Sequence, residues 1–459
     1  MVLATSTAIS GLIGANKGMA FIKRHKLSKP YQVKTDIIAD SPTIYAASHS
    51  TQAALNIDKQ TKQKADRCVM CGLCLPHCPT YIKTQNEAES PRGRISLIMA
   101  LSNGQLEPDI KLHRHLDNCL LCRACEIKCP SGVQFGEIMD GARHALGISK
   151  PESEQRASLT QLSTDKKRQH REATTLWLAN KTGLRALGRN LGITKAIGIE
   201  RFEQLAPNIK RPHGWKDYYP AQHKHRGDVA LFTGCVSNML DQRTLDDAIT
   251  VLTACGYGVH IPAAQTCCGA LHQHTGNRKK AKQLAQQNIQ AFSALQIEAI
   301  ISCATGCGGH MSEYQALVGA AIPTRDINTF LCDIASPQNM TFRPLKKRVA
   351  VHEPCSLRNV LKESHAIYSL LAHIPELELL ALAGNNQCCG GAGSYMIDHP
   401  DMADKLRNDK LDALQTIHPD ILATANIGCA LHIAAGMRQT GIQLEVLHPV
   451  SLLARQLVA

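Results

Sequence analysis

Apolar and polar positions alternate most regularly over the C-terminal half of the chain. Short apolar runs at 229–232 and 348–352 predict buried strands, and amphipathic stretches at 241–252, 278–292 and 402–414 predict helices. Strands that alternate with helices are typical of parallel α/β domains. The first 230 or so residues show no such alternation, so the two halves are expected to be built differently.

The C-terminal half also repeats itself. Its cysteine landmarks recur about 120 residues later, with a drift of roughly one residue per landmark. The pairs are Cys235 with Cys355, Cys267-Cys268-Gly269 with Cys388-Cys389-Gly390, and Cys307 with Cys429. This indicates an internal duplication, copy one (228–340) and copy two (341–459), each ordered strand, Cys, helix, Cys-Cys-Gly, helix, strand, Cys, helix. Ligands of parallel sheets gather beyond the carboxyl ends of strands, where these cysteines are predicted to lie.

The N-terminal part contains two cysteine quartets of identical spacing, C-x2-C-x2-C-x3-C-P. In bacterial iron–sulfur domains the first three cysteines of such a run hold one cubane, and the fourth ligates the other cluster. Zinc sites use pairs of ligands rather than two identical quartets. We therefore predict two 4Fe–4S clusters. The first is expected on Cys68, Cys71, Cys74 and Cys129, and the second on Cys119, Cys122, Cys125 and Cys78.

The cysteines of the repeat are candidate metal ligands. Adjacent cysteines cannot readily close an unstrained disulfide, whereas their thiolates can converge on a metal with thiolates from flanking strands. Copy one offers Cys235, Cys267, Cys268, Cys303 and Cys307, and copy two offers Cys355, Cys388, Cys389, Cys429 and His432. Because Cys303 has no counterpart, the copies are unequal. Each copy is expected to hold an additional iron–sulfur cluster or zinc, the alternative being that one copy is a scaffold. His310 and His432 are either ligands or hydrogen-bonded structural histidines.

A helix is predicted between the two quartets. Ser90 and Pro91 are typical of an N-cap followed by proline at the first helical position, and Gly104 marks the end. Arg92 and Arg94 fall in the first turn, against the preference of the helix dipole. Two interpretations have equal weight: the arginines face the anionic clusters, or they are solvated surface charges.

Composition narrows the possible partners. The net charge is +13, and a basic excess lies in the connector 151–227, where a helical piece is predicted at 174–191. This segment is either a solvated connector or a surface for an acidic protein or anionic lipid. Only 4% of residues are aromatic, so stacking platforms for nucleic acid are not expected. The cysteines occur in patterns that bind clusters, and clusters need thiolates, so a reducing, cytosol-facing compartment is expected. No apolar run reaches the length of about 18 residues that a spanning helix needs.

These patterns predict an α+β protein of five segments. They are a variable, disordered leader (1–60), a mostly helical two-cluster ferredoxin-like domain (61–150), a basic helical connector (151–227), and the two α/β copies (228–340 and 341–459).

At these residues the sequence resembles the iron–sulfur subunit of glycolate oxidase, also called glycolate dehydrogenase. Two ferredoxin-type quartets precede two cysteine-rich C-C-G domains, and shorter stretches strengthen the match. They are Pro91-Arg92-Gly93-Arg94-Ile95, Cys129-Pro130-Ser131-Gly132, Ala392-Gly393-Ser394-Tyr395, and Asn426-Ile427-Gly428-Cys429 with His432. Where the C-C-G family ends in C-x2-C, copy one has C-x3-C and copy two has Cys429 with His432.

The resemblance implies a complex in which a separate FAD-binding 2-hydroxy-acid dehydrogenase subunit oxidises glycolate or D-lactate to glyoxylate or pyruvate. This chain would carry electrons from that flavin to a membrane quinone, in the cytoplasm and peripherally associated with the inner face of the cytoplasmic membrane. No G-x-G-x-x-G follows a strand, so hydride chemistry is expected on the partner and no catalytic residue is predicted here.

Three alternatives stay open at this point. The iron–sulfur subunit of anaerobic glycerol-3-phosphate dehydrogenase shares the layout, although the stretch 426–432 favours glycolate oxidase. The C-C-G domains also resemble heterodisulfide reductase, which implies thiol–disulfide reduction by this chain. The third alternative is an assembly scaffold with zinc in the repeats.

Overall fold

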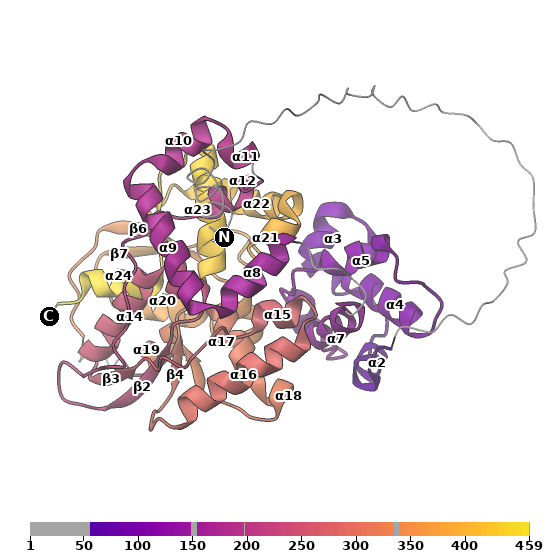
Figure 1. Cartoon of the computed structure of the whole chain (residues 1–459), viewed down its shortest axis with the longest axis horizontal. Helices are drawn as coiled ribbons and strands as arrows, with labels where there is room; N and C mark the ends of the chain where they lie inside the picture. Colours follow the sequence, from indigo (N-terminus) through magenta and orange to yellow (C-terminus); the bar gives the residue numbers. More distant parts are fainter. Residues whose placement is uncertain (1–55, 148–153, 197, 335–339, 459) are drawn as a thin grey trace, which may run out of the picture.

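The computed structural model describes residues 56–147, 154–196, 198–334 and 340–458. A helical N-terminal domain lies against a larger body built from the two copies (Figure 1). The predicted disordered leader falls almost wholly on residues 1–55, outside the described residues. The N-terminal domain begins before residue 61, because Ile57 is buried in its core and Asp58 caps its first helix.

The N-terminal domain consists of short helices around one apolar core. They are α2 (Lys59–Ala65), η1 (Leu75–His77), α3 (Pro79–Thr84), η2 (Glu87–Glu89), α4 (Pro91–Ser102), α5 (Ile110–Asp117), α6 (Ala124–Ile127) and α7 (Phe135–Gly147). Helix α4 confirms the prediction between the quartets: the Ser90 hydroxyl accepts a hydrogen bond from the Gly93 amide, and Pro91 occupies the first position. Leu101, Ile98 and Ile138 fill the core.

The described part of the connector forms five helices over the outer side of the repeat. They are α8 (Glu154–Thr164), α9 (Lys166–Lys181), α10 (Leu184–Asn190), α11 (Ile193–Ala196) and α12 (Glu200–Leu205). Leu162 and Leu176 pack against Met239 and Leu431 of the two copies. The predicted helix at 174–191 is interrupted at Gly183, which has a φ of +73° and starts α10. Glycine adopts this left-handed conformation without steric cost, which allows the chain to turn there.

In the described residues copy one is an α/β unit with one five-stranded sheet. It begins before residue 228, because the strand Tyr218–Tyr219 of this sheet lies within the predicted connector. Its elements are β1 (Tyr218–Tyr219), β2 (Gly227–Phe232), α13 (Val236–Leu240), α14 (Gln242–Ala254), β3 (Tyr257–His260), α15 (Ala270–His274), α16 (Arg278–Ser293), β4 (Ile300–Ser302), α17 (Thr305–Ser312), α18 (Tyr314–Val318), β5 (Thr324–Asp326) and α19 (Ile327–Ile334). The strand order is β1-β3-β2-β4-β5, parallel except for β1.

Copy two repeats this plan with four parallel strands in the order β7-β6-β8-β9. Its elements are β6 (Lys347–His352), η3 (Ser356–Leu361), α20 (His365–Leu371), β7 (Leu377–Ala381), α21 (Tyr395–Asp398), α22 (Pro400–Ile417), β8 (Ile421–Thr424), α23 (Ile427–Thr440), β9 (Glu445–Leu447) and α24 (Pro449–Gln456). In each copy the first parallel strand, β2 or β6, lies inside the sheet; the chain passes to β3 or β7 on one side of it and then to β4 or β8 on the other, so the strand order reverses at this strand. Such switch points are where α/β sheets bind ligands.

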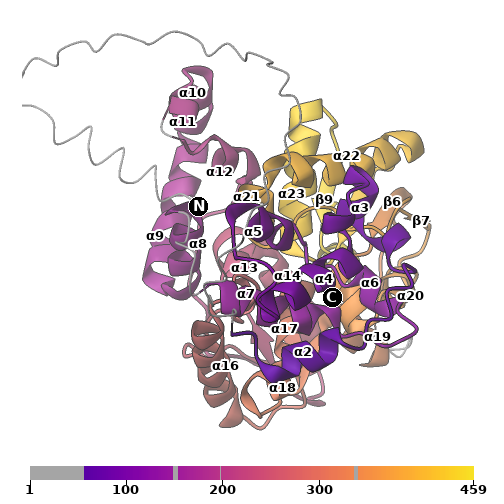
Figure 2. The same ribbon diagram turned by 90° about the vertical axis from the view of Figure 1, so that its right-hand side faces the viewer.

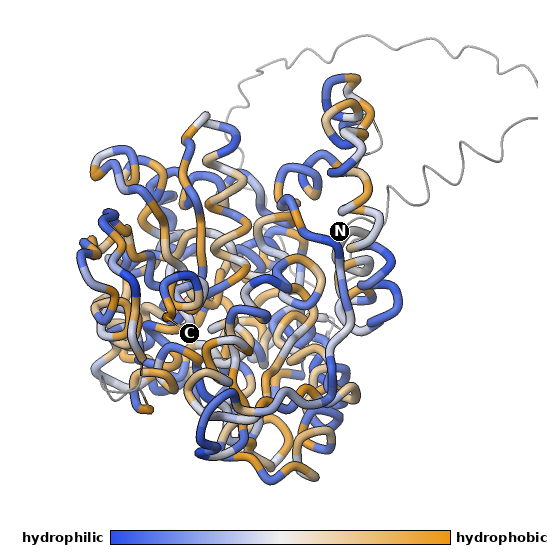
Figure 3. The backbone as a smooth tube through the Cα atoms, turned by 90° about the vertical axis from the view of Figure 1, so that its left-hand side faces the viewer, coloured by the Kyte–Doolittle hydropathy of each residue, from blue (hydrophilic) through white to orange (hydrophobic). Residues whose placement is uncertain are grey.

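Both faces of each sheet are buried. Val229 and Leu231 point into a core that is shared with Val349 and Val351 of copy two, whereas Ala230 points to the opposite, local core. Continuous apolar strands follow from burial on both faces, as expected for parallel sheets. Figure 3 shows hydrophobic and hydrophilic residues alternating along the helices that cover the sheets. The fold is therefore α+β, with a helical domain followed by duplicated α/β units, as predicted.

Candidate metal centres

The first cysteine run of the N-terminal domain forms a surface loop after α2. Met70 and Gly72 adopt positive φ angles, which turn the loop between successive cysteines. The Arg92 guanidinium donates to the Met70 carbonyl at 3.0 Å and supports this turn. Cys71 is exposed, and Cys68, Cys74 and Cys129 pack against the edge of the same core. Three of the four residues predicted for the first cluster thus lie at the edge of one core, and the fourth, Cys71, lies on the surface loop between two of them.

The second cysteine run lies deeper. Leu121 and Arg123 take positive φ angles between Cys119, Cys122 and Cys125, the same turn geometry as in the first run. One small cavity is lined by these three cysteines together with Cys78, the fourth cysteine of the first run. Burial raises the pKa of the Cys125 thiol, and the charges of Cys122, Cys119 and Cys78 raise it further. Four sulfurs that repel one another as thiolates suit a bound iron–sulfur centre.

The two arginines of the first turn of α4 have different environments. Arg94 is 1% exposed, pairs with buried Glu89 at 2.6 Å, and lies 4.0 Å from the Cys78 sulfur. Arg92 is on the surface, where it pairs with Glu87 at 2.6 Å. Of the two interpretations of these residues, Arg94 follows the cluster-facing one, and Arg92 follows the surface one while supporting the loop of the first run.

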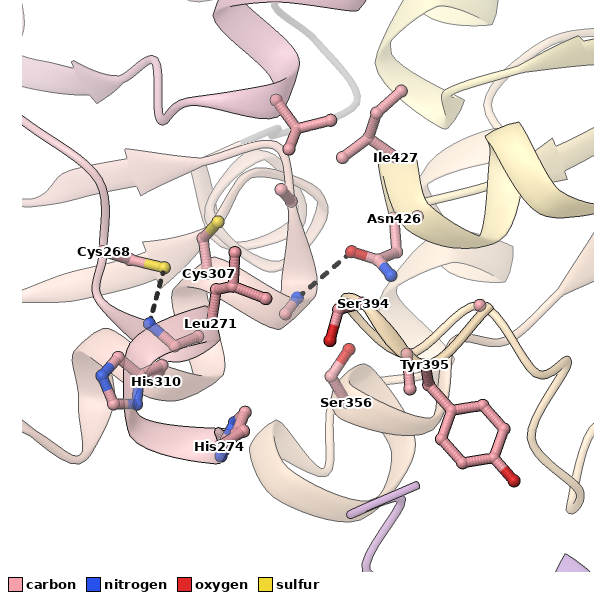
Figure 4. A pocket seen from close by; sticks show the side chains of 18 of the residues that line it. Cys268, Leu271, His274, Cys307, His310, Ser356, Ser394, Tyr395, Asn426 and Ile427 are labelled. Atoms are coloured by element: carbon pink, nitrogen blue, oxygen red, sulfur yellow. Dashed lines mark hydrogen bonds between the residues drawn. The ribbon is translucent and has the colours of Figure 1, made fainter. Parts of the chain in front are cut away.

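In copy one the two adjacent cysteines lie between two flanking thiols. Cys235 follows β2, Cys307 lies in the first turn of α17 after β4, and the Cys235 and Cys267 sulfurs are 3.6 Å apart. The Gly269 amide donates to the Cys267 sulfur, and the Ala270 amide donates to the Cys268 sulfur. Figure 4 shows the second of these bonds. Hydrogen bonds from Cys235 and Cys268 hold the pKa of the Cys267 thiol well below its usual value, so this thiol is prepared to ionise.

Cys303 lies apart from these four thiols. It packs into the core shared by the two copies, whereas Cys267 and Cys268 pack into the local core. Burial and the charges of Asp326 and Asp241 raise the pKa of its thiol. The predicted ligand set of copy one is therefore brought together as a quartet, with Cys303 separate.

His310 has unusual surroundings at the first site. It is 5% exposed, and neither ring nitrogen finds a hydrogen-bond partner among the described residues. Its ring meets those of His274 and Tyr314 edge-on (Figure 4). Burial lowers its pKa to about 4, so the imidazole is neutral and able to donate a lone pair. Unpartnered buried nitrogens beside Cys267 fit a site that takes a metal.

Copy two gathers the equivalent thiols. The Cys355 and Cys388 sulfurs are 3.9 Å apart, and the Gly390 amide donates to Cys388 at 3.4 Å. Hydrogen bonds from Cys388 and Cys429 lower the pKa of the Cys389 thiol well below its usual value. His432 is buried beside Cys389, with Nε2 3.1 Å from the Ala403 carbonyl oxygen and Nδ1 without a partner in the described part of the chain.

The sequence interpretation did not include His352, which ends β6 three residues before Cys355. Its side chain lies beside Cys389 and Cys429, and all three residues are buried. The signal was present in the repeat itself, because His352 occupies the place of Phe232 in copy one. An apolar residue replaced by histidine at the carboxyl end of a central strand is a substitution that an alignment of the two copies exposes.

A single cavity of about 350 Å³ joins the two quartets, with Cys235, Cys268 and Cys307 on one side and Cys355, Cys389 and Cys429 on the other. The two copies meet at this cavity, where Thr305 and Ser356 share a hydrogen bond of 2.7 Å. The Gly306 amide also donates to the Asn426 side-chain oxygen (Figure 4). In the described ranges, no helix is both long enough and apolar enough to cross a bilayer.

Comparisons with known proteins agree with this architecture. Residues 64–133 match a family model described as "4Fe-4S dicluster domain", and residues 229–312 and 349–434 each match one described as "Cysteine-rich domain". These matches support iron–sulfur clusters in the chain.

Full-length relatives match across both parts. The chain is 31% identical over 417 residues to the "Probable glycolate oxidase iron-sulfur subunit" of Bacillus subtilis, covering 85% of this chain and 94% of that protein. It is 32% identical over 390 residues to the "Glycolate oxidase iron-sulfur subunit" of Escherichia coli, covering 81% and 90%. "Lactate utilization protein A" of Oceanobacillus iheyensis is 27% identical over 238 residues, which is 49% of this chain and 96% of that protein. The chain belongs to the glycolate oxidase iron–sulfur subunit family.

Proposed function

We propose that the chain is the iron–sulfur electron-transfer subunit of a flavin-dependent 2-hydroxy-acid dehydrogenase complex. A partner FAD subunit oxidises glycolate to glyoxylate, or D-lactate to pyruvate, and this chain delivers the electrons to a quinone at the inner face of the cytoplasmic membrane. Relatives named for glycolate oxidase and lactate utilization support the substrate class. Iron–sulfur clusters, when bound, accept and release single electrons, which leaves the two-electron oxidation to the partner.

The observation that carries this proposal is a continuous series of thiol sites from the surface to the interior. Cys71 in the first run is exposed, and Cys78 of that run already lies in the second quartet. Cys122 of the second quartet lies next to Cys355 of copy two. The pKa of the Cys122 thiol is raised mainly by burial and next by the charge of Cys355. The Asn359 amide donates to the Cys122 carbonyl at 2.6 Å and fixes this contact. Figure 2 shows the N-terminal helices lying across the repeat.

The exposed end of the series suits contact with a partner. Val69, Met70 and Leu73 flank Cys71 and are 68%, 42% and 57% exposed. The structure describes all 19 cysteines of the chain, and Cys71 alone is exposed; the others are buried or half-buried. We place the contact with the flavin subunit on this loop, because an apolar rim around an accessible site excludes water when a partner binds.

Cys71→Ser in the co-purified complex tests the proposal. Glycolate should still reduce the flavin at the wild-type rate, whereas quinone reduction should fall to background because the first site loses a ligand. Cys332→Ser is the matched control. The Cys332 thiol donates a hydrogen bond to the Ala366 carbonyl and belongs to none of the quartets. Unchanged quinone reduction in Cys71→Ser would refute the proposed route. Comparing glycolate with D-lactate as reductant identifies the substrate.

A further inference from the structure

On the basis of the metal centre proposed for copy two, we infer that His352 is a nitrogen ligand of that centre, together with the thiolates of Cys389 and Cys429. Copy two is then a mixed imidazole–thiolate site, whereas copy one has an apolar side chain at the same position. The inference concerns iron or zinc, the two metals that such a donor set suits.

The three side chains converge from separate elements. His352 ends β6, Cys389 belongs to the loop before α21, and Cys429 lies in the first turn of α23. Their ligand atoms all lie within 4.8 Å of one another, and the residues are 1%, 2% and 3% exposed. Nitrogen and sulfur ligands on one tetrahedral metal are about 3.5–3.8 Å apart, given the usual bond lengths. A small contraction would therefore bring these three ligand atoms to the spacing that one bound metal requires.

The imidazole is already oriented for this role. Its Nδ1 lies 2.9 Å from the Thr424 hydroxyl, and His352 and Thr424 are direct partners in the register of β6 and β8. Metal-binding histidines use the nitrogen that does not face the metal in such a hydrogen bond, which fixes the ring. The other nitrogen, Nε2, is therefore available to a metal held by Cys389. Cys388 and Cys429 lower the pKa of the Cys389 thiol most, and a hydrogen bond from His352 lowers it further.

Copy one lacks this arrangement although its backbone is equivalent. Phe232 stands in the place of His352 and is paired with Ser302 in the register of β2 and β4. Its ring packs against Phe292, with the centroids 6.4 Å apart. The position is therefore a filled apolar site in one copy and a nitrogen donor in the other.

The experiment compares His352→Phe, which restores the copy-one residue, with His352→Cys, which keeps a metal-binding side chain. His432→Phe is the matched control, because His432 is also buried beside Cys389 but uses Nε2 on the Ala403 carbonyl. Each full-length chain is purified anaerobically for iron, sulfide and zinc content. Cells supplied with ¹⁵N-histidine allow nitrogen couplings to an iron centre to be measured by electron–nuclear double resonance. If zinc is found, its K-edge absorption spectrum reports nitrogen and sulfur ligands directly.

His352→Phe should lose the metal of one centre. With iron, the strong coupling to the histidine nitrogen should disappear; with zinc, the nitrogen ligand should disappear from the absorption spectrum. His352→Cys should keep the metal and lose only the nitrogen signal. Iron of the N-terminal quartets should persist in all variants and shows that the chain is folded. The inference is wrong if His352→Phe keeps both the metal and the nitrogen signal, or if His432→Phe alone removes that signal. These readouts need no flavin partner, so they are independent of whether quinone reduction fails.

Discussion

The two copies of the repeat share a backbone plan and differ in the side chains around equivalent thiols. In both, the glycine after the paired cysteines has a positive φ, +92° at Gly269 and +86° at Gly390. A Cβ at either glycine would meet the backbone of the following long helix, at Ala281 in copy one and at Ala403 in copy two. Because glycine alone permits this close approach, the duplication preserves the turn that aims two adjacent sulfurs at one point.

The surroundings of those sulfurs have diverged in charge. Asn288 on α16 donates to the Cys267 carbonyl at 2.9 Å and accepts from the Thr266 amide, so it braces the cysteine loop of copy one. The equivalent residue on α22 is Lys410, which is 1% exposed and donates to the Gly384 carbonyl. With Phe232 replaced by His352 as well, copy two has a more basic environment. The backbone thus fixes where thiols meet, and the side chains are free to tune the centre.

The largest expected effect comes from removing one thiol of each pair. Cys389→Ser and Cys268→Ser should each lose the metal of their own copy, because a hydroxyl is a poor ligand for iron or zinc, while about eight irons of the N-terminal clusters remain. Since Cys355 lies beside Cys122, Cys268→Ser should leave copy two reducible, whereas Cys389→Ser should also stop reduction of copy one. Metal analysis with spectroscopic reduction measures both. If the two variants behaved alike, the proposed order, in which electrons reach copy two before copy one, would be wrong.

The next effect concerns the buried ammonium of copy two. Burial lowers the pKa of Lys410, while the thiolates of Cys389 and Cys388 oppose this. Lys410→Asn, which installs the copy-one residue, should lower the reduction potential of the copy-two centre, because a nearby positive charge favours the reduced form. A shift on the order of 59 mV corresponds to a tenfold change for a one-electron couple. Lys405→Asn on the exposed side of the same helix is the control, and a potentiometric titration in which both variants match wild type would contradict the role of Lys410.

A smaller effect is expected where copy two meets the N-terminal domain. Asn359→Ala removes the hydrogen bond to the Cys122 carbonyl and should cost about 1–3 kcal/mol of local stability, because a buried acceptor is left without its donor. Amide hydrogen exchange across Ser356–Leu361 would register the loss. Thr250→Ala, at an exposed position of copy one, should leave that exchange unchanged. Unaltered protection in Asn359→Ala would mean that the contact does not couple the two regions.

The sequence predicted the parts of this molecule that depend on local spacing. The helix that begins after Ser90, the two central strands and the paired cysteines all follow from short patterns. The strand β3 and the edge strand β7 were missed; β3 has only four residues, and β7 is half-exposed along its length. The burial of Arg94 and the position of His352 depend on partners outside the local motif. The Cys78 sulfur and the His115 carbonyl are 16 and 21 residues from Arg94, and Thr424 is 72 residues from His352. Spacing within a motif does not contain that information.

The smallest expected effect is at Cys303, whose equivalent in copy two is Ala425. Cys303→Ala should leave the iron and zinc content of the chain unchanged, because Cys303 packs into the core shared by the two copies and the paired thiols pack into the local core. Loss of the buried sulfur should cost about 1 kcal/mol of stability. Cys307→Ala is the contrasting variant, since its sulfur interacts with Cys268 and its removal should release the metal of copy one. If Cys303→Ala released metal as well, copy one would hold its centre with five thiols, one more than copy two offers.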